Sequence, residues 1–286
     1  MRDITNSMFT INTYGGSETK KTCYIEGEKY MVKFPDPVRE NNKDISYVNN
    51  QYSEYISCKI FELFGIDVQK TELVKCFIDG KEKIAVMCED FLNDDEMLIE
   101  FKTLSYSLST EKIYTNELSD IFDMVKELDT LTDKNEFEDK FWDIFIVDTL
   151  IGNVDRHLGN WGIVAKFNTS KLSPVYDCGS ALHPLLSETE IKELLKNGEL
   201  KNISINLKTA YKLNGKTLNY LDIYKNMPEK LKSSLKRMHS KISLDAIKNI
   251  VYSTPTLTDE MKEFYYKTIE IRKNEIIDKY YKEINI

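Results

Sequence analysis

The chain has 286 residues, of which 41% are hydrophobic and 30% are charged, a composition typical of a folded globular protein. Its 39 Lys and Arg residues face 47 Asp and Glu residues, which gives a formal net charge of −8. This acidic balance argues against a protein that binds nucleic acid directly, because such binding needs a basic surface. The length predicts one large domain or two lobes with a sizeable core.

The ends of the sequence and its cysteines indicate a protein of a reducing compartment. No Sec-type signal peptide is visible, and the most apolar stretch, residues 141–152, is short and contains Asp143 and Asp148. The five cysteines include no C-x-x-C pair, a pattern typical of reduced thiols and not of a zinc site. We therefore expect a cytoplasmic protein without membrane association, unless a route other than Sec exports it.

The N-terminal part of the chain is predicted to be rich in strands. Strands are predicted at residues 9–11, 22–25, 30–34, 71–78 and 83–88, and one helix is predicted at 47–64. Glu26-Gly27-Glu28 and Asp79-Gly80 have the composition of hairpin turns, and Gly65 suits the C-terminal cap of the helix.

The rest of the chain is predicted to be mainly helical. Helices are predicted at residues 118–128 and 137–151 and from about 185 onward, ending in a long helix at 259–281, with short strands at 161–165 and 173–176. The sequence thus predicts an α+β protein of two lobes. Residues 1–90 form a small β-rich lobe in this interpretation, and residues 91–286 form a larger helical lobe.

The most informative segment is the polar loop at residues 152–162. Asp155 and Asn160 lie in the spacing D-x-x-x-x-N, which is the arrangement of a protein-kinase catalytic loop. Asp155 would orient the hydroxyl of the substrate, and the amide oxygen of Asn160 would bind Mg²⁺, which prefers hard oxygen ligands. Asp177, in Asp177-Cys178-Gly179, would supply a second such ligand.

Each of these patterns alone also suits an ordinary turn. Their order after an apolar helix favours a site for phosphoryl transfer, where a base and a metal must lie close together. His157 is a further catalytic candidate, expected to brace the loop, with proton acceptance as the alternative. Arg156 is expected to have a structural role, with stabilisation of phosphate charge as the alternative.

A nucleotide-binding lysine is expected in the first lobe. Lys33 lies among Met31, Val32 and Phe34, where an unpaired ammonium would be costly to bury. Glu54, in the following helix, is the expected ion-pair partner, and Glu62 is its competitor near the helix end. The alternative for Lys33 is an edge-strand lysine that prevents aggregation.

Two further segments are candidates for nucleotide contacts. Gly15, Gly16 and Ser17 lie in a turn whose backbone N–H groups could hold phosphates, although an ordinary hairpin turn fits equally well. At the junction of the lobes, Glu89 and Phe91 would present backbone groups to the adenine, and a plain linker is the alternative.

Taken together, these segments resemble the HipA-like serine/threonine kinases. The carrying residues are Tyr14 to Ser17, Tyr30 to Pro35, Ser53 to Tyr55, Gly152 to Asn160 and Tyr176 to Ser180. The resemblance implies a two-lobed protein-kinase-like fold, ATP with Mg²⁺ as donor, and protein Ser/Thr hydroxyls as acceptors. It implies Asp155 as the base, Asn160 and Asp177 as metal ligands, and Lys33 as the phosphate-binding lysine.

The same resemblance implies regulation. Such kinases often phosphorylate a serine of the phosphate loop, a place that Ser17 occupies, and some work as toxins with an antitoxin partner. We therefore expect an autophosphorylating protein kinase, acting as a toxin or effector, with an antitoxin or another regulatory partner. A lipid or small-molecule kinase and a nucleotide-binding pseudokinase remain the alternatives.

Overall fold

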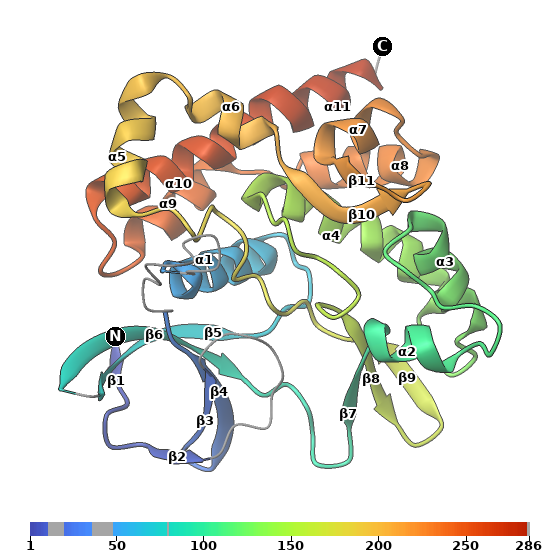
Figure 1. Ribbon diagram of the computed structural model, residues 1–286, viewed down its shortest axis with the longest axis horizontal. Coiled ribbons are helices and arrows are strands. Elements are labelled where there is room, and N and C mark those ends of the chain that lie inside the picture. The colour runs from blue at the N-terminus through green and yellow to red at the C-terminus, as the bar shows by residue number, and fades with distance from the viewer. Residues whose placement is uncertain (11–19, 36–47, 79, 285–286) are drawn as a thin grey trace.

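The computed structural model describes residues 1–10, 20–35, 48–78 and 80–284. A β-sheet with one helix forms the N-terminal part, and a larger assembly made mainly of helices lies above it (Figure 1). This is the α+β arrangement that the sequence predicts. In the described part of the chain, no helix is long and apolar enough to cross a membrane.

The N-terminal sheet has the strand order β1-β5-β6-β4-β3-β2. Its strands are β1 (Arg2–Asp3), β2 (Met8–Thr10), β3 (Lys20–Ile25), β4 (Glu28–Lys33), β5 (Thr71–Ile78) and β6 (Lys81–Glu89). β1 runs parallel to β5, and the other neighbours are antiparallel. Between β3 and β4, Glu26 and Gly27 have φ of 55° and 91°, as a tight hairpin turn requires.

Helix α1 (Asn50–Leu63) covers one face of this sheet. Leu73, Val86 and Cys88 of that face belong to the same hydrophobic core as the helical part of the protein. The opposite face has a smaller core of its own, which includes Val32 and Val74. Strand β4 therefore lies between two cores, and alternate residues of the strand face each of them.

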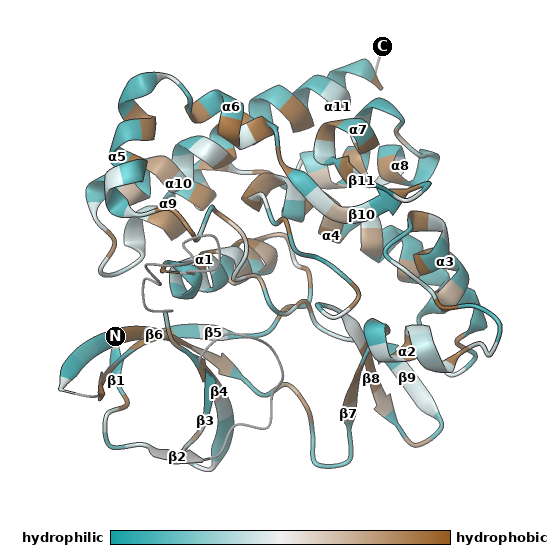
Figure 2. Cartoon of the chain, in the orientation of Figure 1, coloured by the Kyte–Doolittle hydropathy of each residue, from teal (hydrophilic) through white to brown (hydrophobic). Residues whose placement is uncertain are grey.

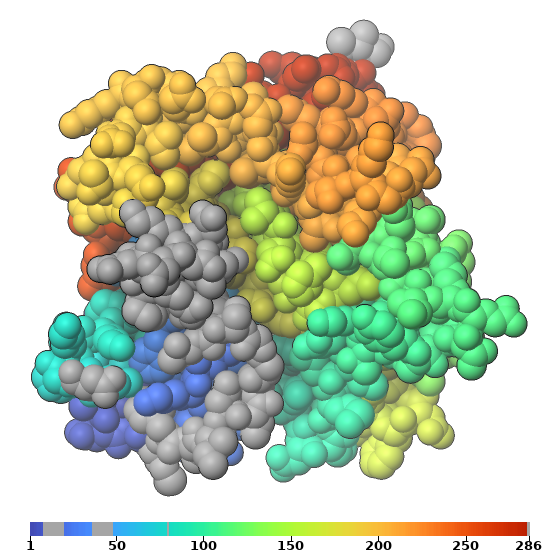
Figure 3. Space-filling view, in the orientation of Figure 1, coloured from blue at the N-terminus to red at the C-terminus, as the bar shows by residue number. Residues whose placement is uncertain are grey.

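The remaining chain is built around α4 (Phe137–Ile151), most of whose residues are buried. The other elements in chain order are β7 (Met97–Glu100), α2 (Phe101–Ser107), α3 (Leu118–Glu127), η2 (Lys134–Glu136), β8 (Gly162–Lys166), β9 (Thr169–Leu172), α5 (Glu188–Asn197), α6 (Leu200–Ile205), β10 (Lys208–Leu213), β11 (Lys216–Asn219), α7 (Tyr220–Lys225), α8 (Glu229–His239), α9 (Leu244–Ser253), α10 (Asp259–Arg272), η3 (Lys273–Asp278) and α11 (Lys279–Glu283). Figure 2 shows that the outer helix α5 is largely hydrophilic, and Figure 3 shows α2 and α3 beside the N-terminal part on the same face.

Two predictions of secondary structure are wrong in detail. The strand predicted at 173–176 is absent: β9 pairs with β8 before it, and Pro174 lacks the N–H that a ladder needs. A hairpin, β10–β11, interrupts the region predicted as helical, with its turn at Asn214-Gly215. The long C-terminal helix predicted at 259–281 is confirmed, and it includes a π-helical segment, Lys273–Asp278.

A buried ion pair joins α4 to the loop that follows it. Arg156 and Asp148 are each 1% exposed. The guanidinium donates from Nε to Asp148 Oδ2 (3.0 Å) and from Nη2 to Asp148 Oδ1 (3.1 Å). Burial alone would lower the pKa of Arg156, but the carboxylate of Asp148 raises this pKa well above its ordinary value. Arg156 thus has the structural role that the sequence favours.

The other N–H groups of Arg156 connect two more segments. Nη1 donates to the carbonyl oxygens of Asn160 (3.1 Å) and Tyr176 (2.7 Å), and Nη2 lies 3.4 Å from the sulfur of Cys178. The loop after α4 and the segment after β9 are therefore held at fixed positions relative to each other. Both segments carry candidate site residues.

We expect Arg156→Met to destabilise the protein by about 3–5 kcal/mol, because it leaves the carboxylate of Asp148 buried without a cation. Arg237→Met is the matched control. Arg237 also pairs with a carboxylate of α4, Asp143 (2.7 Å), but its side chain is 41% exposed, and the loss should stay below about 1 kcal/mol. Urea unfolding of both variants measures the difference, and equal losses would show that the buried pair has no special structural role.

Candidate active site

Lys33 is a buried cation at the end of β4. It is 1% exposed, and its Nζ lies 2.8 Å from Oε2 of Glu54 and 2.8 Å from Oδ1 of Asp177. Glu54 comes from α1, whereas Asp177 follows β9 and belongs to the helical part of the chain. The competing glutamate, Glu62, is exposed and pairs with Lys59 at 2.8 Å. One ammonium group thus connects the sheet, the helix and the segment after β9.

Glu54 is fully buried and contacts this segment with its other oxygen. Its Oε1 accepts the backbone N–H of Cys178 at 3.0 Å. A buried carboxylate is stable only when its oxygens are paired, and here an ammonium and a backbone N–H pair them. The position of α1 and the position of Asp177 are therefore linked through a single side chain.

Asp177 combines a strained backbone with a stabilised charge. Its φ of 56° lies in the left-handed region, which non-glycine residues rarely adopt. Burial alone would raise the pKa of its carboxyl group, but Lys33, together with Lys20 and Arg156, holds this pKa at about 2. Asp177 is therefore a carboxylate over the physiological pH range, and its side chain is still 31% exposed.

Asp155 lies in the loop after α4 with its carboxylate partly exposed. The carboxylate has Ser180 Oγ at 3.5 Å and His157 Nε2 at 3.7 Å. Burial raises the pKa of Asp155 above its ordinary value, the neighbouring carboxylate of Asp177 raises it further, and His157 opposes both effects. A carboxylate with a raised pKa is a better proton acceptor than an ordinary aspartate.

Asn160 is a buried residue at the end of the same loop. Its Nδ2 donates to the backbone oxygen of Asp155 at 2.6 Å, which directs the amide oxygen away from this bond. The carboxylate of Asp177 and the amide oxygen of Asn160 form a donor set of hard oxygens, which suits Mg²⁺. Arg156 holds both segments through the carbonyl oxygens of Asn160 and Tyr176.

His157 has a bracing position in this loop. Its Nδ1 accepts the backbone N–H of Gly159 at 3.0 Å, so Nε2 carries the proton of the neutral ring and faces Asp155. A Cβ at Gly159 would lie 2.9 Å from Cε1 of His157, so a larger residue here would displace the imidazole ring from this position.

At the junction between the two parts of the chain, backbone hydrogen bonds distinguish Glu89 from Phe91, the two candidates for contact with adenine. The backbone N–H of Glu89 donates to Lys70 O (3.0 Å), and its carbonyl accepts from Gln69 Nε2 (2.9 Å). Within the described residues, no backbone hydrogen bond engages Phe91, whose ring lies 6.1 Å from that of Tyr176. The candidates Gly15, Gly16 and Ser17 lie outside the described residues.

Sequence reasoning missed several contributors to this arrangement. Asp148 is the partner of Arg156, and Asn153 donates to Asp148 Oδ1 at 2.9 Å while accepting the N–H of Asp155 at 3.1 Å. The role of Asp148 could have been suspected from the sequence, because a charged residue inside the apolar helix 137–151 needs a partner. No sequence pattern indicated that the hydroxyl of Ser180 would lie beside Asp155.

Two cysteines that are far apart in the sequence meet beside Glu54. The sulfur atoms of Cys58 and Cys178 and a carboxylate oxygen of Glu54 all lie within 4.8 Å of one another, and the three residues are buried. Cys58 follows Glu54 by one helical turn, which the sequence shows, but the approach of Cys178 depends on the tertiary structure. These ligand-type atoms are fewer than a structural zinc site uses.

Comparison with known proteins identifies relatives of this site and fold. Residues 13–246 match the HipA-like C-terminal domain. The serine/threonine-protein kinase CtkA of Helicobacter pylori (strain J99) is 32% identical over 274 residues, which cover 93% of this chain and 82% of that protein.

Solved structures agree with this relationship. The crystal structure of the proinflammatory kinase CtkA from Helicobacter pylori superposes with a TM-score of 0.87 and 30% identity, covering 98% of this chain and 97% of that chain. A chain in the complex of HipA, HipB and operator DNA from Shewanella oneidensis MR-1 has a TM-score of 0.62 at 13% identity, with 95% and 67% coverage, and shows the shared fold.

These findings confirm the predicted two-lobed kinase fold and the predicted class of enzyme, a kinase. They also settle the family, which the loop at residues 152–160 indicated from the sequence. The chain belongs to the HipA-like C-terminal domain family.

Proposed function

We propose that this chain is a serine/threonine protein kinase that uses ATP with Mg²⁺. The observation that carries the proposal is the meeting of Lys33, Glu54 and Asp177 at 2.8 Å contacts beside the loop that holds Asp155. The acceptor class, a protein Ser or Thr hydroxyl, is proposed from the similarity to the serine/threonine-protein kinase CtkA.

Lys33 is the proposed phosphate-binding residue. Its ammonium is held by Glu54 from the side of α1, so it is positioned before a nucleotide arrives. Positioning of this kind lowers the barrier because little reorganisation is needed during the reaction. The backbone of Phe91 is the proposed contact for adenine, in preference to Glu89, whose backbone groups already have partners.

Asp155 is the proposed catalytic base. Its carboxylate is partly exposed and has a raised pKa, so it can orient the acceptor hydroxyl and receive its proton. Asn160 and Asp177 are the proposed Mg²⁺ ligands, and the donor set of amide and carboxylate oxygens fits that ion. When bound, Mg²⁺ would neutralise the charge of the phosphate groups.

Regulation and location are further parts of the proposal. We expect Ser17 to be an autophosphorylation site, and we expect a protein partner such as an antitoxin, because the related fold occurs in a complex of HipA with HipB. Five free cysteines support a cytoplasmic location, or entry into a target cell by a non-Sec route.

The experiment that tests the function uses labelled ATP and Mg²⁺ with the purified protein and protein extract. Label should enter protein Ser or Thr residues, and Asp155→Asn should reduce the rate at least ~10²-fold. Phosphosite mapping then shows whether Ser17 is modified. If label enters only lipids or small molecules, the acceptor is not a protein. Undiminished turnover of Asp155→Asn would refute Asp155 as the base.

Lys33→Met should reduce kcat/KM at least ~10²-fold, because the phosphates lose a positioned cation. It should also raise the pKa of Asp177 from about 2 toward its ordinary value. In the wild type, the stabilisation from the Asp177 carboxylate is present above its unfolded pKa, near 3.8, and is lost as pH falls toward 2. Carboxyl NMR titration measures this shift, and the control is Lys75→Met, which removes a half-buried lysine of β5 that pairs with Asp3 and Glu82.

His157→Gln separates bracing from proton acceptance. His157 lowers the pKa of Asp155, so its removal should raise this pKa and move the acid limb of the pH–rate profile to higher pH. The sign follows because the base acts as a carboxylate, and activity is lost as pH falls through its pKa. The rate at high pH should fall less than tenfold. A fall as large as that of Asp155→Asn at every pH would make His157 the proton acceptor.

A further inference from the structure

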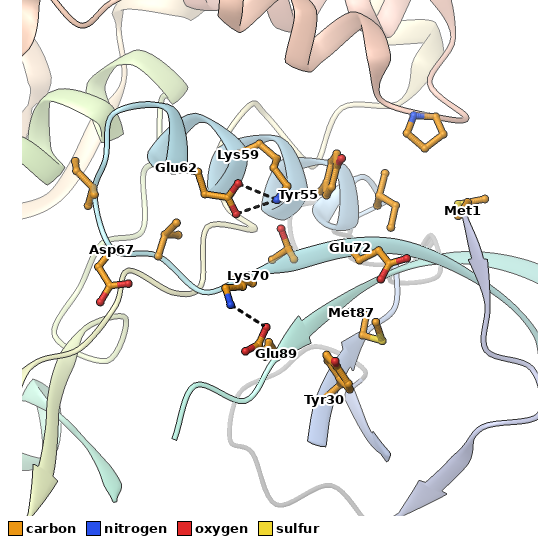
Figure 4. Close-up of a pocket in the computed structure, with 15 residues that line it drawn as sticks. Met1, Tyr30, Tyr55, Lys59, Glu62, Asp67, Lys70, Glu72, Met87 and Glu89 are labelled. Atoms are coloured by element: carbon orange, nitrogen blue, oxygen red, sulfur yellow. Dashed lines mark hydrogen bonds and ion pairs between the residues drawn. The ribbon is translucent and has the colours of Figure 1, made fainter. Parts of the chain in front are cut away.

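A groove of about 940 Å³ opens between α1 and the first residues of β5 (Figure 4). Tyr55, Lys59 and Glu62 of α1 form one wall, and the opposite wall comes from the ends of β5 and β6. Of the candidate site residues that the structure describes, Glu89 lines the groove, as does Glu62, whereas Lys33, Glu54, Asp155, Asn160 and Asp177 do not. The groove is therefore separate from the proposed catalytic loop, although it shares helix α1 with the active site.

The groove carries a surplus of negative charge. Its lining side chains include four acids, Glu62, Asp67, Glu72 and Glu89, and two lysines, Lys59 and Lys70, and with the N-terminal ammonium of Met1 the balance is 3 − 4 = −1. Asp67 is exposed, and no cation of the described chain pairs with it. Lys70 and Glu89 are 3.7 Å apart with side chains 75% and 40% exposed, a contact that an incoming cation can replace at little cost.

Apolar surface and a strand edge lie beside these charges. Tyr30, Tyr55 and Met87 also line the groove (Figure 4). β5 pairs with β1 at Val74 and Lys75, and the chain just before β5 bonds to Val175, so among the described strands none pairs on that side with the first residues of β5. An extended segment suits such a place, because its side chains alternate between two directions.

We propose that this groove binds an extended peptide of a partner protein in which basic side chains alternate with apolar ones. The basic side chains would face Asp67 and the neighbouring carboxylates, and arginine is favoured because it binds carboxylates through two parallel hydrogen bonds. The apolar side chains would pack against the tyrosines and Met87.

The occupant would contact the helix that positions Glu54. Glu54 pairs with Lys33 from one side of α1, while Tyr55, its neighbour, lies in the groove. A loop of the helical lobe also meets the helix here: Pro255 lines the groove, and Thr256 Oγ1 lies 2.8 Å from Tyr52 Oη. Thr256 has φ of 66°, an outlier for a β-branched residue, and strain of this kind is typical of ligand clamps.

The test uses a fluorescein-labelled peptide in which arginine alternates with phenylalanine, and a twin with glutamate in place of arginine. Fluorescence anisotropy with the full chain should show saturable binding of the arginine peptide only. The double variant Glu62→Lys/Asp67→Lys should weaken binding at least tenfold. The control Asp129→Lys/Glu229→Lys makes the same change in net charge at exposed positions outside the groove, and should stay within twofold of the wild type.

Equal weakening in both double variants would overturn the proposal, because binding would then follow net charge alone. Absence of saturable binding to the wild type would also overturn it. An effect of the bound peptide on the active site through α1 rests on the proposed function and is measured separately. The peptide should change the KM for ATP at least twofold. Fluorescence anisotropy measures binding and needs no catalysis. Absence of peptide binding therefore does not contradict the kinase assignment, and peptide binding can be tested even if the protein shows no kinase activity.

Discussion

The burial of Arg156 is the constraint on which the candidate site depends. A guanidinium without solvent must find acceptors for all of its N–H groups, and it cannot lose its proton to escape this requirement. The acceptors come from Asp148 on α4, from the carbonyl oxygens of Asn160 and Tyr176, and from the sulfur of Cys178. The two segments that carry Asn160 and Asp177 therefore take their positions from one buried side chain.

The second constraint is the shared ammonium of Lys33. Two carboxylates, Glu54 and Asp177, approach the same Nζ at 2.8 Å, and without that cation two like charges would lie close together in a poorly solvated place. The left-handed backbone of Asp177 costs of order 1–3 kcal/mol and persists because its carboxylate and the following N–H, at Cys178, both have partners. Ordering this strained residue requires α1 to be in place, so the sheet and the helical lobe complete the site together.

The sequence predicted those parts of the site that are carried by local patterns. The spacing of Asp155 and Asn160, and a lysine at position 33 inside an apolar strand, are visible without a structure, because loop chemistry and burial leave marks on neighbouring residues. The strands of the N-terminal sheet and helix α4 were predicted from the spacing of apolar residues, which is also a local pattern. The contacts of Arg156 with Tyr176 and Cys178 and the meeting of Cys58 with Cys178 depend on contacts between distant segments. Such contacts follow from the packing of the whole chain, and a single sequence does not display them.

Helix α1 joins these constraints because its side chains point in several directions from one rigid element. Glu54 and Cys58, one turn apart, face Asp177 and Cys178, whereas Tyr55, Lys59 and Glu62 follow the neighbouring line of the helix and face the groove. A rigid helix cannot shift one line of side chains and leave the other in place. Any force on the groove side is therefore felt at the ion pair between Glu54 and Lys33, which is buried and has little freedom to adjust. The fold thus places the groove on the same helix whose Glu54 holds the ammonium of Lys33.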